Sequence, residues 1–103
     1  MGIAQGATPY LMITVVGHDL SDADAVVVSL RTHQQAVDLD MSRVTVTTDG
    51  TDSLLTVHLT QEETLSLTPH SATIQARWRK NGEAHTTEAA QIDVASCLYK
   101  GVI

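Results

Sequence analysis

The chain has 103 residues and carries twelve acidic against six basic side chains, a net charge of −6. This length allows one domain with one core and excludes most multi-domain enzymes. The acidic balance disfavours nucleic-acid binding, because phosphate contacts need lysine and arginine. Phe is absent and only Trp78, Tyr10 and Tyr99 are aromatic, so aliphatic residues and Thr must fill the core. Because β-branched residues favour pleated surfaces, the composition predicts an all-β domain.

The cysteine content and the first residues of the chain indicate the compartment in which the protein is made. The single cysteine, Cys97, cannot form an internal disulfide, which favours folding in a reducing environment. Residues 1–9 lack the basic start and apolar stretch of a signal peptide, and no run is long enough to cross a bilayer. We expect a cytoplasmically made protein without a membrane partner.

Three strands are predicted in the first 40 residues. An apolar run over 10–16 ends at Gly17, and acidic turn residues follow it. The run over 25–32 places Val26, Val28 and Leu30 on one face, as a period of two requires. A weaker alternation over 35–40 predicts a third strand, which should pair with the second across a short connection.

A hairpin is predicted next. Residues 43–48 alternate with Val44 and Val46 facing inward, and a second alternating run over 55–59 follows the turn Asp49-Gly50. Asp-Gly between two such runs is a strong hairpin signal.

The period changes at Thr60. Thr60 stands three residues before Glu63, the spacing of a capping box, so we expect a short helical turn over 60–67 that ends before Pro69. Leu65 and Leu67 are expected to cover an open end of the domain.

The clearest strand spans 72–80 and turns Trp78, the one large aromatic available to the core, inward. Asn81-Gly82 predicts a type I′ turn. The returning strand is expected to run unbroken over 84–95, with Ile92 and Val94 facing inward.

About seven short strands separated by turn signals predict an antiparallel, immunoglobulin-like β-sandwich, although without that family's cysteine pair. A small open barrel is the alternative. We expect an N-terminal segment over 1–9, one sandwich domain over 10–97 and a C-terminal tail over 98–103.

No motif in the chain indicates catalysis or a resident cofactor. The five histidines lack the short spacings of zinc ligands and are interpreted as separate loop and surface residues. The acidic turn over 19–24 lacks the glycine and distal glutamate of a calcium loop. No nucleophile elbow or glycine-rich phosphate loop occurs. We expect a non-enzymatic protein without catalytic residues, metal, cofactor or small-molecule substrate.

Two further features are interpreted as structural. Arg77, Arg79 and Lys80 are half of the basic residues; a small positive spot is one interpretation of them, and a solvated strand face is the favoured one. Cys97 has no feature that would activate its thiol and is expected to be a half-buried residue at the end of the last strand.

The residues that carry a family resemblance are the segment 58–64, the strand 72–79, the turn Asn81-Gly82 and the ending 97–103. Through them the sequence resembles small virion and tail-assembly proteins of prophages in Gram-positive (Firmicutes) gut bacteria. The resemblance covers residues 54–103 and extends to the first half only in pattern. The chain is also distantly similar to the N-terminal β-sandwich of phage baseplate upper proteins. The resemblance implies a structural protein of the tail, baseplate or connector, located in the virion and assembled in the host bacterial cytoplasm.

Its implied partners are other phage structural proteins, including copies of itself. The residues that we expect to contact a partner are Tyr10, Leu98, Tyr99, Val102 and Ile103, although the tail residues could equally fold back onto their own sandwich. The net charge supports an alternative, a small acidic phage-encoded inhibitor of a host or defence protein. A β module that binds a small molecule or a carbohydrate is the third class, but lectin-like sites usually present exposed aromatic residues and this chain has few.

Overall fold

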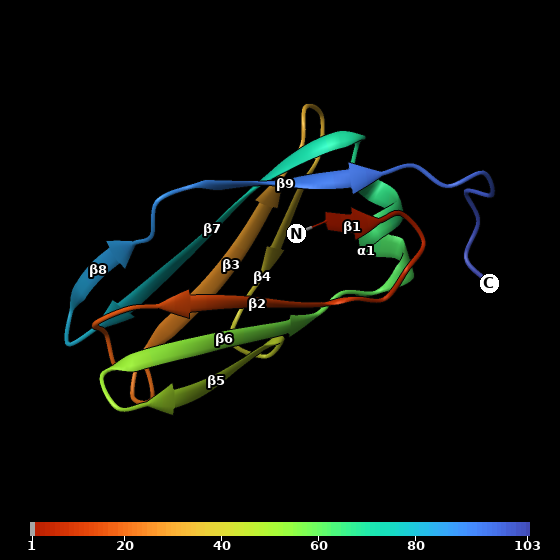
Figure 1. Ribbon diagram of the computed structural model, residues 1–103. Helices are drawn as coiled ribbons and strands as arrows, with labels where there is room; N and C mark the ends of the chain where they lie inside the picture. The colour runs from red at the N-terminus through yellow and green to blue at the C-terminus, as the bar shows by residue number, and fades with distance from the viewer. Residues whose placement is uncertain (1) are drawn as a thin grey trace.

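The computed structural model describes residues 2–103, which form nine strands and one helix in two facing sheets (Figure 1). The elements, in chain order, are β1 (Gly2–Ala4), β2 (Tyr10–Val15), β3 (Ala25–Arg31), β4 (Ala36–Leu39), β5 (Val44–Asp49), β6 (Asp52–His58), α1 (Gln61–Ser66), β7 (His70–Lys80), β8 (Glu83–Thr86) and β9 (Ala90–Ala95).

The strand order confirms an immunoglobulin-like sandwich. One sheet has the order β1-β9-β7-β3-β4, with β8 also beside β7, and the other has the order β2-β6-β5. In the immunoglobulin fold the second, fifth and fourth strands form one sheet and the third, sixth and seventh form the other. Here β2, β6 and β5 correspond to the second, fifth and fourth strands of that fold. The strands β3, β7 and β9 correspond to its third, sixth and seventh strands. The two sheets are separate, which distinguishes the structure from an open barrel.

The core lies between the sheets and follows the predicted alternation. Val26, Val28 and Leu30 of β3 are buried, and so are Leu55 and Val57 of β6. The side chain of Trp78 is also buried, as predicted. Leu67 after α1 closes one end of this core, while Leu65 is only half-buried.

The local signals for turns and the helix are confirmed. The Thr60 hydroxyl accepts from Glu63 N at 3.2 Å, and Glu63 Oε1 accepts from Thr60 N at 2.8 Å, which completes the capping box. Asn81 and Gly82 both have positive φ, 54° and 80°, as a type I′ turn requires. Between β5 and β6 only the glycine, Gly50, has positive φ.

One strand lies where none is predicted. Residues 2–4, within the expected N-terminal segment, form β1 and pair with β9, with Ile3 opposite Val94 and buried in the core. This pair is parallel, which corrects the expectation of a wholly antiparallel fold. Because β1 joins the sheet of β9, β2 is left at the edge of the other sheet.

The predicted continuous strand over 84–95 is wrong, because a bulge interrupts it. Trp78 lies opposite His85 and Ile74 lies opposite Ala90, so four steps along β7 face five steps along the returning chain. Thr87 absorbs the extra residue: its N donates to Ala76 O at 2.9 Å, and its hydroxyl accepts from Ala76 N at 3.0 Å. The bulge exchanges the two faces of β8, so His85 lies on the same face as Trp78.

Candidate functional site

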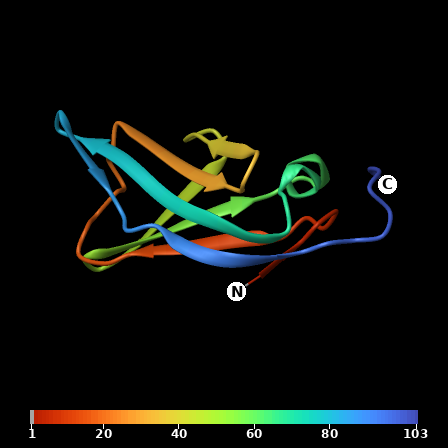
Figure 2. The same cartoon turned by 90° about the horizontal axis from the view of Figure 1, so that it is seen from above.

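The C-terminal tail, residues 98–103, runs past the end of β9 at the α1 end of the sandwich (Figures 1 and 2). Four of its side chains are large, apolar and exposed, and Leu98 and Ile103 are almost completely so. These four residues are Leu98, Tyr99, Val102 and Ile103. The contacts that hold the tail against the domain are therefore not made by these apolar side chains.

Gln5 is the first contact that holds the tail. It is buried, its Oε1 accepts from Lys100 Nζ at 2.6 Å and from Cys97 N at 3.3 Å, and its Nε2 donates to Leu67 O at 2.8 Å. One side-chain amide thus joins the start of the tail to the end of α1. Cys97 is half-buried just beyond β9, as predicted.

Gln61 is the second contact. Its Nε2 donates to Ile103 O at 3.0 Å, and its Oε1 accepts from Ile103 N at 2.8 Å. This amide pairs with both main-chain groups of one residue, as a neighbouring strand would. The tail is consequently tied at both ends, while its apolar side chains face solvent.

A pocket of about 410 Å³ lies between the tail and the body of the domain, and Val102 and His58 are among the residues that line it. Tyr10 stacks on His58, with ring centroids 4.1 Å apart and planes at 10°. His58 Nε2 lies 3.0 Å from Thr8 O, which holds the ring in place. The structure therefore brings Tyr10, at the start of β2, to the same end of the molecule as the tail. We call Tyr10, His58, Leu98, Tyr99, Val102 and Ile103 the tail surface.

The helix beneath the tail is anchored to the second sheet by an ion pair. Arg43 donates to both carboxylate oxygens of Glu63, at 2.8 and 3.0 Å, and also to His58 O at 2.9 Å. Partial burial opposes the charge of Glu63, but hydrogen bonds from Arg43 and the backbone of Thr60 outweigh it and lower the pKa of this carboxyl. The hydrogen bond between the two side chains also raises the pKa of Arg43.

Two histidines interpreted as separate lie together at the opposite end of the sandwich. The ring of His18 is 5.1 Å from that of Trp78 and 5.8 Å from that of His85, and Trp78 and His85 are 5.7 Å apart, measured between centroids. They line a pocket of about 440 Å³ together with Lys80 and Glu83. Sequence spacing could not reveal this cluster, because the bulge after β8 places His85 on the same face as Trp78.

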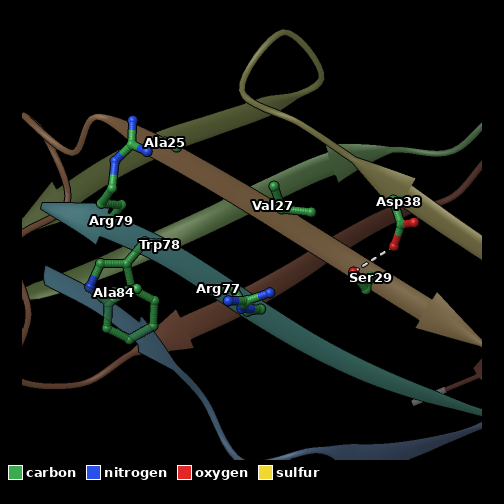
Figure 3. Close-up of a pocket in the computed structure, with 8 residues that line it drawn as sticks. All are labelled: Ala25, Val27, Ser29, Asp38, Arg77, Trp78, Arg79 and Ala84. Atoms are coloured by element: carbon green, nitrogen blue, oxygen red, sulfur yellow. Dashed lines mark hydrogen bonds between the residues drawn. The ribbon is translucent and has the colours of Figure 1, made fainter. Parts of the chain in front are cut away.

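The three clustered basic residues do not form one positive spot. Lys80 Nζ contacts Asp22 Oδ1 at 2.8 Å and Asp19 O at 2.7 Å, on the side of the acidic turn. Arg77 and Arg79 lie on the outer face of the larger sheet, where they line a shallow pocket of about 450 Å³ with Val27 (Figure 3). Within residues 2–103 neither arginine forms an ion pair.

The residues of the candidate site that the sequence analysis did not single out are Gln5, His58 and Gln61. The pairing of β2 with β6 places His58 directly opposite Tyr10, so a correct prediction of that pairing would have found the stack. Nothing in the local sequence distinguishes Gln5 or Gln61 from other glutamines, because the partners of Gln5 lie at least 62 residues away in the sequence and that of Gln61 lies 42 residues away.

Among residues 2–103, no three His, Cys, Asp or Glu side chains come together as metal ligands would. The one helix of this part of the chain is too short and polar to span a membrane. No protein-family model matches the sequence, and no curated protein matches it.

Proposed function

We propose that the protein is a non-enzymatic structural component of a phage tail, baseplate or connector, which acts through protein–protein contacts. The observation that carries this proposal is the tail surface, where four apolar side chains are exposed on a segment whose main chain is tied down. Clustered apolar exposure on a small protein marks a surface that another molecule covers. The resemblance of residues 54–103 to small prophage virion proteins supports the phage assignment.

The tied tail favours high affinity for a partner. A segment already held in one conformation loses little conformational entropy when a partner covers it, so more of the contact energy appears as affinity. Tyr10 and Tyr99 belong to a residue type that is enriched among interface hot spots. The proposed partners are other structural proteins of the particle, met in the host bacterial cytoplasm.

The proposal is tested by mixing the purified protein with the tail and baseplate proteins encoded by its neighbouring genes and measuring complex formation by size-exclusion chromatography with light scattering. Leu98→Asp and Val102→Asp should each weaken the complex at least about tenfold, the effect of about 1.4 kcal/mol. Met41→Asp is the matched control, because Met41 is an exposed apolar residue outside the tail surface.

Unchanged binding by both tail variants would contradict the role of the tail surface. A complex formed only with a basic host protein, and lost as salt is raised, would replace the structural function with the acidic inhibitor.

A further inference from the structure

β2 presents an unpaired edge with its hydrogen-bonding groups in place. Among the described residues it pairs only with β6. Leu59 N donates to Pro9 O at 2.9 Å, so residue 9 belongs to a hydrogen-bonded pair. Such pairs alternate along an antiparallel ladder, which directs the odd-numbered residues of β2 toward β6. The N–H and C=O groups of Tyr10, Met12 and Thr14 consequently point to the open side.

This edge lacks the features that usually prevent strands from pairing with other molecules. Residues 10–16 contain no charge and no proline, and Tyr10, Met12 and Val16 are 62%, 54% and 73% exposed. Native edge strands are normally blunted by charge, proline, short length or a covering segment.

The other sheet edges of residues 2–103 are protected. β1 has three residues, β4 carries Asp38 near its end, and β8, which pairs only with β7, has four residues that include Glu83. β5 ends at Asp49 and begins beside Arg43. A charged side chain therefore lies on or beside each of these edges except that of β1, whereas the uncharged β2 can pair with its own copy without placing like charges opposite one another.

We propose that β2 pairs with β2 of a second copy of this chain, antiparallel and about a two-fold axis at Ile13. This register pairs the whole strand: Tyr10 faces Val16 of the partner subunit, and Met12 faces Thr14 of the partner subunit. In this register the N–H and C=O groups that bond across the new interface belong to even-numbered residues of β2, because those of the odd-numbered residues already bond to β6. Two three-stranded sheets then become one continuous sheet.

This inference goes beyond the proposed function, because the tail surface takes no part in it apart from Tyr10. Its test needs only the isolated protein, so it can fail while the tail-surface contacts survive, and the reverse also holds.

Sedimentation equilibrium of the full chain is the first test. We expect a concentration-dependent species of twice the 11.0 kDa monomer mass. Met12→Lys should raise the dimer dissociation constant at least about tenfold, because it removes apolar contact and brings the lysine charges of the two copies near each other across the interface. Thr45→Lys, which places the same charge on the exposed face of β5, should leave the constant unchanged. A monomer at every concentration, or a dimer equally weakened by both variants, would overturn the pairing.

Disulfide trapping tests the register in a Cys97→Ser background. Directly opposed residues of an antiparallel hydrogen-bonded pair have Cα atoms about 5.5 Å apart, within disulfide range, whereas diagonal neighbours lie about 7–8 Å apart. A mixture of Met12→Cys and Thr14→Cys proteins should therefore form the mixed disulfide in preference to either homodimer. Preferential Met12→Cys homodimers would overturn the register, and circular dichroism confirms that each variant is folded.

Discussion

Arg43 and Glu63 join the start of β5 to the first turn of α1 through two nitrogen–oxygen contacts of 2.8 and 3.0 Å. The same carboxylate caps the helix at Thr60, so one side chain serves both a local and a long-range contact. A helix of six residues is marginal alone, which makes this anchor important for its position beneath the tail.

The ion pair predicts a pH dependence of stability. Because the pKa of Glu63 is lowered in the folded state, its contribution is present above the ordinary value of 4.5 and is lost as the pH falls through the folded pKa. Glu63→Gln should therefore lower the free energy of unfolding by about 1 kcal/mol or less at neutral pH, since solvent screens a partly exposed pair. Urea denaturation at neutral pH and well below pH 4.5 should show the difference between the two proteins shrinking with acidity. A constant difference would mean that the charge of Glu63 contributes nothing.

Trp78 provides a test of the core. It is 5% exposed and is the one tryptophan of the chain. Trp78→Ala should lower the free energy of unfolding by about 3–5 kcal/mol through lost burial and the cavity left behind. Trp78→Phe, which keeps an aromatic ring, should lower the free energy of unfolding by less. Unfolding followed by circular dichroism measures both, and a loss below about 1 kcal/mol for the alanine variant would contradict the inward position.

The bulge at Thr87 satisfies a buried amide. Ala76 is fully buried, and the Thr87 hydroxyl accepts from its N–H. Thr87→Val keeps the shape but leaves that donor unpaired, so stability should fall by about 1–3 kcal/mol. Thr86→Val on the exposed strand β8 is the matched control and should stay within about 0.5 kcal/mol of the parent. Equal effects of the two changes would argue against the hydrogen bond.

Gln5 should control the order of the tail. Gln5→Leu preserves burial and approximate size but removes the acceptor for Lys100 and Cys97 and the donor to Leu67. Amide hydrogen exchange read by mass spectrometry should be faster in 97–103 than in the parent protein. Gln91→Leu, an exposed change on β9, should leave this exchange unaltered. Unchanged exchange in the Gln5 variant would show that other contacts hold the tail.

Local signals predicted most of the fold. The period of two placed Val26, Val28 and Leu30 in the core, and the capping box and the type I′ turn lie where their residues indicate. These features depend on neighbours a few residues apart, so they can be recognised in one sequence.

The features that were missed depend on distant partners. β1 is too short to show an alternation, and it forms because β9, about 90 residues later, offers an edge. The bulge at Thr87 leaves no glycine or proline as a signal, so alternation alone assigned β8 the wrong face. The apolar tail could be recognised in the sequence, but its exposure and its anchoring by Gln5 and Gln61 required the three-dimensional structure.

Quantitative mass spectrometry of purified phage particles tests the proposed structural role most directly. Particles should be prepared from an induced host that carries the gene, as the parent, Leu98→Asp or Met41→Asp. Peptides of this protein should be present at a fixed ratio to the other tail proteins in the parent and the Met41 variant, and depleted at least about tenfold in the Leu98 variant. Intact parent particles that contain the other tail proteins but no peptide of this protein would contradict the structural role.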